Sequence, residues 1–300
     1  MRARCSCYDF AMQLSVVSDE RCPLCEGRGW VVESDGGAGA ARPCSCREQD
    51  LVQRMVAAAG IPPRYQHCKI SSFQTSSQSP RVRTLLMGAR KIAQDYVDNF
   101  VLQEDQGFRQ SGLLFIGPPG VGKTHLAAGV LMELIERHRV HGRFAEFTSL
   151  IHQIQSTFDP GSPESKRAIL DPLLDAELLV LDELGAQKPT PWVRDILYLM
   201  INHRYTRRLP TLFTTNYLLD PPSARAVQAS GAAGGMPVKI QSLDRGRDPE
   251  PLSAVDDSGL LATRLPSMLV SRLYEMAQPV VLTGVEDFRR EHKAHGTRLR

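Results

Sequence analysis

Gly117-Pro118-Pro119-Gly120-Val121-Gly122-Lys123-Thr124 forms a complete phosphate-binding loop, preceded by the apolar run Leu113–Ile116 and followed by a helical sequence from His125. The three glycines allow successive backbone N–H groups to converge on phosphate oxygens, and the N-terminus of the following helix adds partial positive charge. In such a loop the lysine reaches the β- and γ-phosphates and the threonine hydroxyl ligates Mg²⁺. The motif therefore predicts that residues 117–125 bind ATP with magnesium. The alternative is a glycine-rich turn without a ligand.

Composition places the chain among globular proteins with reduced thiols. Its 300 residues carry a formal net charge of +3, which is too small to indicate a nucleic-acid partner by itself. Because there is neither an apolar run long enough to cross a bilayer nor a recognisable signal peptide, we expect a cytoplasmic protein without membrane contact. In that compartment its seven cysteines are more typical of metal binding than of disulfides.

Strand-like and helix-like segments alternate from Gly112 onward, which predicts an α/β three-layer sandwich around a parallel five-stranded sheet. The expected strands are Leu113–Ile116, Arg143–Phe147, Leu178–Leu181, Thr211–Thr215 and Val280–Leu282, and the expected helices ahead of them are Arg47–Ala59 and Arg81–Phe100. Residues 222–258 break the alternation and are interpreted as a mobile surface insertion. We expect a cysteine-rich module in 1–60, a linker and lead-in helix in 61–111, and the nucleotide-binding domain in 112–300.

Polar residues end two of the predicted strands. Asp182 and Glu183 follow Leu178–Leu181, and Asn216 follows Thr211–Thr215. Ligands of parallel sheets bind at the carboxyl ends of the strands. Asp182 is therefore predicted to hold Mg²⁺ with Thr124, and Glu183 to polarise the attacking water. Asn216 is predicted to sense the γ-phosphate. Acids or an asparagine after a strand are also common in solvated turns. The assignment of these roles therefore depends on the presence of the phosphate-binding loop in the same chain.

Over about residues 61–290 the chain resembles AAA+ ATPases, and more narrowly the bacterial DnaC/DnaI helicase loaders and the related IstB transposition helper. The matching stretches are Ile61–Tyr65, Gly117–Leu126, Leu179–Gly185, Asn202–Tyr205 and Leu209–Asn216. The Asp-Glu-Leu-Gly and Asn-x-Arg-Tyr pieces are the more specific ones. The resemblance implies an ATPase that loads a replicative helicase onto single-stranded DNA. An IstB-like transposition helper and a nucleotide-binding adaptor without turnover are the alternatives.

The resemblance also assigns catalytic roles to two arginines. Arg272, in the helical stretch Leu269–Leu273, matches an arginine finger that reaches the ATP of a neighbouring subunit and thus implies self-association. Arg289 matches the sensor 2 position and acts within its own subunit. An arginine on an amphipathic helix also commonly faces solvent. As in the loaders that the chain resembles, we expect no C-terminal helical lid.

Four cysteines in two closely spaced pairs predict a structural zinc site. The candidate ligands are Cys22, Cys25, Cys44 and Cys46. Two pairs from separate turns complete a closed tetrahedral site, and a segment this small needs a metal for stability. Cys5 and Cys7 form a competing pair, and free thiols are the other alternative. In the DnaI-like loaders a zinc module engages the helicase, so the resemblance assigns that role to residues 1–60. Cys68 is expected to be a lone buried thiol.

Basic residues near the predicted nucleotide site give a weaker indication of DNA binding. Arg204, Arg207 and Arg208 form the densest cationic group there. Such a group suits phosphate contacts, but it equally suits a solvated helix end, where cations interact favourably with the helix dipole. DNA contact is therefore expected chiefly from the resemblance.

Overall fold

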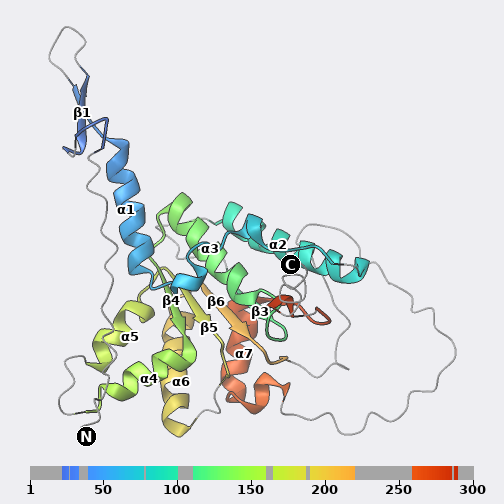
Figure 1. The fold of residues 1–300 in the computed structure, drawn as a ribbon. Helices are drawn as coiled ribbons and strands as arrows, with labels where there is room; N and C mark the ends of the chain where they lie inside the picture. Colours follow the sequence, from blue (N-terminus) through green and yellow to red (C-terminus); the bar gives the residue numbers. More distant parts are fainter. Residues whose placement is uncertain are drawn as a thin grey trace, which may run out of the picture. The chain divides into compact units, whose positions relative to one another are not determined.

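We analysed a computed structural model of the chain. It describes residues 22–26, 28–33, 40–77, 79–100, 111–159, 165–186, 190–219, 259–285 and 287–289. The chain divides into two compact units, residues 1–53 and 54–300, so the division falls inside helix α1 (Ser45–Ala58; Figure 1). Cys5 and Cys7, the predicted insertion 222–258 and the last eleven residues lie outside the described residues.

The first unit contains a small antiparallel hairpin of β1 (Trp30–Glu33) and β2 (Ala40–Pro43). Trp30 lies opposite Pro43 in its register. The backbone N–H of Cys44 donates to the carbonyl oxygen of Gly29 at 2.9 Å, which continues the pairing beyond β2. The hairpin thereby brings the residues before β1 next to the residues that begin α1.

The second unit is built on a five-stranded parallel sheet, as predicted, with the strand order β4-β5-β6-β3-β7. The strands are β3 (Gly112–Ile116), β4 (Gly142–Glu146), β5 (Leu178–Asp182), β6 (Thr211–Thr215) and β7 (Ala277–Val281). Every residue of β3, β5 and β6 is buried, which suits the interior of a sheet covered on both faces. At the edge, β7 exposes Gln278 and Pro279, and an edge strand tolerates proline.

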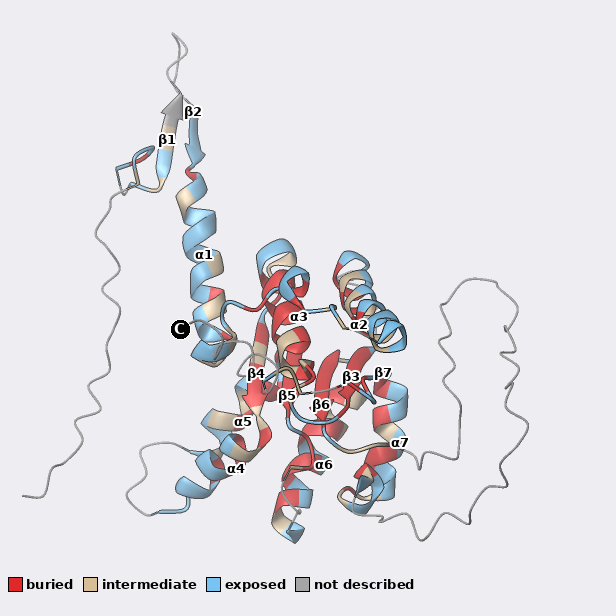
Figure 2. Ribbon diagram, turned by 45° about the vertical axis from the view of Figure 1, so that its right-hand side comes forward, coloured by how far each residue is buried: buried red, intermediate tan, exposed pale blue. Residues whose placement is uncertain are grey.

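Helices cover both faces of this sheet (Figures 1 and 2). Helices α2 (Pro80–Asp98) and α3 (Lys123–His138) lie on one face. The other face carries α4 (Phe147–Ser156), α5 (Lys166–Leu174), α6 (Pro191–Thr206) and α7 (Ser267–Met276), whose apolar side chains form one buried cluster with those of the strands. The chain crosses the sheet in one direction from β3 to β4 and in the opposite direction from β4 to β7. Because crossovers between parallel strands are right-handed, the helix of the first crossing and the helices of the return lie on opposite faces. The predicted three-layer sandwich is confirmed.

Most predicted strands differ from the observed ones by at least one residue at an end, and two of the differences have local reasons. The strand expected at Arg143–Phe147 ends at Glu146, because the Glu146 carboxylate accepts the backbone N–H groups of Thr148 and Ser149 and so starts α4. The strand expected at Val280–Leu282 begins at Ala277 instead. Only one face of this edge strand is buried, so polar and exposed residues interrupt its apolar pattern. The residues Ala277–Pro279 were therefore not recognised as part of the strand.

The segment before α2 packs on the nucleotide-binding side of α3. It contains two short 3₁₀ turns, η1 (Pro63–Tyr65) and η2 (Ile70–Ser72). The backbone N–H of Ile70 donates to the Glu133 carboxylate of α3 at 3.1 Å, and the ring of Phe73 lies against Gly122. A third 3₁₀ turn, η4 (Leu261–Thr263), precedes α7. Among the helices of the described residues, none is both long and apolar enough to cross a membrane.

Candidate nucleotide site and four-cysteine cluster

The phosphate-binding loop connects the C-terminus of β3 to the N-terminus of α3. Gly120 and Gly122 have φ angles of 82° and 87°, a region that side chains disfavour. The backbone N–H of Gly117 donates to the carbonyl oxygen of Thr215 at 3.2 Å, which ties the loop to the end of β6. Because α3 begins at Lys123, its unpaired N-terminal N–H groups and its dipole face the loop. The backbone is therefore arranged to bind phosphate.

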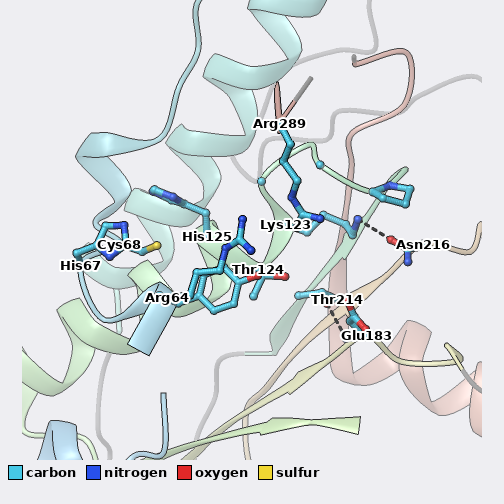
Figure 3. Close-up of a pocket in the computed structure, with 14 residues that line it drawn as sticks. Arg64, His67, Cys68, Lys123, Thr124, His125, Glu183, Thr214, Asn216 and Arg289 are labelled. Atoms are coloured by element: carbon cyan, nitrogen blue, oxygen red, sulfur yellow. Dashed lines mark hydrogen bonds between the residues drawn. The ribbon is translucent and has the colours of Figure 1, made fainter. Parts of the chain in front are cut away.

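A cavity of about 300 Å³ lies beside the loop (Figure 3). It is lined by Arg64, Tyr65, His67, Cys68, Pro119, Gly120, Gly122, Lys123, Thr124, His125, Glu183, Thr214, Asn216 and Arg289. The structure thus brings together the predicted loop residues, the second acid, the polar residue after β6 and the predicted sensor arginine. All of them belong to the second unit.

Lys123 joins the loop to the end of β6. Its side chain is buried, and its Nζ donates to the carbonyl oxygens of Gly117 and Pro118 at 2.9 and 2.8 Å and to Oδ1 of Asn216 at 2.8 Å. Burial lowers the pKa of Lys123 to about 8, although the charges of Asp182 and Glu183 oppose that shift. The three hydrogen-bond acceptors of Lys123 are neutral, so they do not cancel the charge of the ammonium group. That charge can therefore interact with a bound phosphate.

Asp182 lies at the end of β5 with 4% of its surface exposed. Its Oδ1 accepts the hydroxyl groups of Thr124 at 2.9 Å and Thr214 at 2.6 Å. Burial raises the pKa of this carboxyl group, and the two hydroxyl donors partly oppose the rise. A carboxylate and a hydroxyl in direct contact provide the hard oxygen donors that Mg²⁺ prefers. The residues present therefore fit the predicted metal ion.

Glu183 is exposed and lines the cavity. Its φ angle of 59° lies in the left-handed region, which costs a residue with a side chain about 1–3 kcal/mol. Its backbone N–H donates to Oγ1 of Thr214 at 2.9 Å, so one threonine contacts both acids. This contact holds the strained turn and directs the second carboxylate toward the cavity. Local sequence does not single out Thr214, because β6 contains two other threonines, Thr211 and Thr215.

Comparisons with known proteins agree with this geometry. A family model described as IstB-like ATP binding protein matches residues 100–224. The replicative helicase loader DnaC of Escherichia coli (strain K12) is 28% identical over 181 residues, which make up 59% of this chain and 68% of DnaC. The crystal structure of the DnaC helicase loader superimposes with a TM-score of 0.51 at 27% identity, covering 73% of this chain and 99% of that one. The chain is thus similar in sequence and fold to the DnaC/DnaI helicase loaders.

The match to other relatives is partial. The uncharacterized protein YqaM of Bacillus subtilis (strain 168) is 25% identical over 185 residues, and these cover 60% of this chain and 56% of YqaM. The DnaC/DnaI-like chain thus spans little more than half the length of that relative.

The two arginines to which the resemblance assigns catalytic roles, Arg272 and Arg289, lie in different surroundings. Arg289 lines the cavity (Figure 3), whereas Arg272 does not. The Arg272 guanidinium carbon lies 5.0 Å from the ring centre of Tyr198 and 5.4 Å from that of Tyr205. Its Nη1 is buried and has no hydrogen-bond partner among the described residues. Arg272 is therefore held against α6 of its own chain.

Arg204 does not belong to a basic surface that could contact DNA. It is only 1% exposed. Its guanidinium donates to the carbonyl oxygens of Leu173, Leu174, Ala176 and Pro210 and to the Thr211 hydroxyl. Burial lowers its pKa to about 9. A side chain used in this way cannot reach a DNA phosphate, so the prediction for Arg204 is wrong. Arg207 is exposed and forms an ion pair with Asp175 at 2.8 Å.

The cavity also has a wall that we had not predicted. Arg64, Tyr65, His67 and Cys68 line it from the segment around η1. Arg64 makes no hydrogen bond or ion pair with another described residue, and its side chain lines the same cavity as Thr124 (Figure 3). Cys68 is buried, as expected, and burial raises its pKa. The sequence of Ile61–Tyr65 supports the resemblance to the helicase loaders, but no residue pattern in it indicates a ligand-binding site.

The four predicted zinc ligands come together in the first unit, where their sulfur atoms all lie within 4.8 Å of one another. The sulfur atoms of Cys22 and Cys44 are 3.7 Å apart, and those of Cys25 and Cys46 are 3.4 Å apart. Sulfurs bound tetrahedrally to one zinc ion at about 2.3 Å would lie about 3.8 Å apart. The backbone N–H of Gly29 donates to the Cys25 sulfur at 3.2 Å, which stabilises a thiolate. The cluster is compatible with zinc.

Proposed function

We propose that this protein is an ATP-dependent loader of a replicative DNA helicase. The observation that carries the proposal is the pair of contacts Lys123–Asn216 and Thr124–Asp182, which bring the loop and two strand ends to one cavity. This arrangement suits a bound nucleoside triphosphate with magnesium. Escherichia coli DnaC, which shares the fold and 28% sequence identity, is named a replicative helicase loader.

The same contacts suggest how the residues of the site act on ATP. The N–H groups of the loop and Lys123 bind the phosphates, with Lys123 exchanging carbonyl partners for phosphate oxygens. Thr124 and Asp182 would hold Mg²⁺, which would supply positive charge against the phosphates. Glu183 accepts a proton from the attacking water, and Asn216 orients the γ-phosphate. Arg289 adds a cation within the same subunit, and Arg64 faces the cavity as a further cation.

Two further roles follow from the family. We propose that Arg272 leaves Tyr198 and Tyr205 to reach the ATP of a neighbouring subunit, so that hydrolysis requires self-association. We also propose that residues 1–60, stabilised by zinc on Cys22, Cys25, Cys44 and Cys46, bind the helicase, while the AAA+ domain contacts single-stranded DNA. Loss of the γ-phosphate contacts after hydrolysis would then release the helicase. A loader with these partners would act in the cytoplasm.

An IstB-like transposition helper is the second candidate, because the IstB-like family model matches residues 100–224. Co-purification discriminates between the two: a replicative helicase captured by the full chain supports the loader, and a transposase supports the helper. A chain lacking residues 1–53 tests whether the first unit carries the contact.

The proposal is tested by helicase loading on circular single-stranded DNA. Wild-type protein with ATP should transfer the helicase to the DNA, and the Lys123→Ala variant should not. Loading by Lys123→Ala at the wild-type level would contradict an ATP-dependent loader. If the wild-type protein binds ATP but does not load the helicase, the transposition helper is favoured instead.

A further inference from the structure

Residues 287–289 lie directly on the phosphate-binding loop. The backbone N–H of Phe288 donates to the carbonyl oxygen of Gly120 at 3.3 Å. A Cβ atom built on Gly120 would lie 1.8 Å from Oδ1 of Asp287, so the carboxylate fills the space beside that glycine. Gly120 thus has two reasons to lack a side chain: its φ of 82° and the presence of Asp287.

The same carboxylate oxygen also holds the backbone of Arg289. Oδ1 of Asp287 accepts the backbone N–H of Arg289 at 2.9 Å. An aspartate that accepts an N–H two residues later fixes the direction of the turn that follows it. One oxygen atom therefore contacts the loop on one side and orients the backbone of the next arginine on the other.

Arg289 is the residue that this arrangement directs toward the cavity. Its side chain lines the cavity and, in Figure 3, points toward Lys123. Burial lowers the pKa of Lys123, and the Arg289 charge lowers it further, which places the two cations within electrostatic reach. An exposed arginine has many accessible conformations, and an anchored backbone limits where its guanidinium can lie.

A negative charge beside a phosphate-binding loop is unfavourable for binding an anionic ligand. The position of Asp287 is therefore better explained by the hydrogen bond that its oxygen accepts than by its charge. We infer that Asp287 is a positioning residue, which docks Arg289 over the nucleotide phosphates through its contacts with Gly120 and the Arg289 backbone. This inference rests on the proposed function.

The test is a double-mutant cycle on the full chain, with a fluorescent ATP analogue and Mg²⁺ as the probe. Arg289→Ala should weaken binding about tenfold or more, the amount expected for a lost charge-assisted hydrogen bond. Asp287→Ala should weaken binding by a similar factor, and the double variant should bind no worse than Arg289→Ala alone. Asp287→Asn, which keeps the acceptor oxygen, should restore binding to within about threefold of wild type.

Each other result overturns the inference. Additive losses in the double variant would show that Asp287 acts independently of Arg289. Equal losses in Asp287→Asn and Asp287→Ala would indicate that charge matters and the acceptor does not, and tighter binding by either would show that the carboxylate only opposes phosphate. Thermal melting of every variant identifies losses that come from unfolding.

The outcome for the proposed function is separable. Wild-type binding that Lys123→Ala abolishes and Asp287→Ala leaves unchanged would overturn this inference alone. Absence of ATP binding by the wild type would overturn both.

Discussion

The cysteine unit and the nucleotide-binding unit are stabilised by different physical means. In residues 22–53, Cys25 and Cys44 are the only buried residues among those whose burial is described. Residues 54–300 bury apolar side chains on both faces of a five-stranded sheet. A unit without an apolar core would depend on a metal bound by its cysteines, whereas a unit with a large core positions polar groups against a rigid sheet. These polar groups meet where strands β3, β5 and β6 end, as the contacts Lys123–Asn216 and Thr124–Asp182 show.

The largest expected effect is at the second acid of the nucleotide unit. Glu183→Gln should lower ATP turnover by about 10²–10⁴-fold, because the amide cannot accept a proton from water. ATP affinity should stay within about threefold, because the shape of the side chain is preserved. Phosphate release and equilibrium binding measure the two effects. Glu136→Gln, the same change at an exposed position of α3, is the control. Turnover at the wild-type rate in Glu183→Gln would refute the role of the base.

Removal of the metal should affect the other unit alone. Cys22→Ser with Cys25→Ser should reduce bound zinc from one ion per chain to none and make residues 1–53 sensitive to protease, because the ligation that replaces a core is lost. ATP affinity should not change. Metal analysis and limited proteolysis of the full chain provide the measurements. Cys5→Ser with Cys7→Ser should retain zinc, and its loss there would reassign the ligands.

Stability of the nucleotide unit should depend strongly on one buried cation. Arg204→Ala should lower the free energy of unfolding by about 3–5 kcal/mol, because buried carbonyl oxygens lose their donor. Arg207→Ala, three residues away and exposed, should cost less than about 1 kcal/mol. Urea unfolding of both variants measures the difference. Equal effects would mean that the Arg204 hydrogen bonds contribute little.

A smaller effect is expected from pH. Since burial lowers the pKa of Lys123 to about 8 in the free protein, the ammonium is charged below that pH and deprotonates above it. Phosphate binds the charged form, so ATP affinity should be constant below pH 8 and fall by up to about tenfold per pH unit above it. Titration calorimetry between pH 7 and 9.5 measures this, with Lys123→Arg, whose side chain stays charged over this range, as the control. A pH-independent affinity in the wild type would contradict the shift.

The sequence predicted those features whose chemistry is local. The loop of glycines with Lys123 and Thr124, the acids after an apolar strand and the paired cysteines are each a short run that specific chemistry requires. The alternation of strand-like and helix-like segments also sufficed for the parallel sheet, since the central strands β3 and β5 are nearly continuous apolar runs. It failed for β7, where only one face of an edge strand is buried and the run is interrupted by Gln278 and Pro279.

Only the tertiary structure decided which distant residues meet. Thr214 contacts both acids because β6 lies beside β5, and Arg64 and Cys68 reach the cavity because the segment around η1 packs on α3. Arg204 belongs by composition to a basic cluster, yet it lies inside and binds backbone carbonyls. A local pattern reports the periodicity of one segment, whereas burial and partners depend on the order of the strands. That order brings Asp287 to Gly120 across more than 160 positions of sequence.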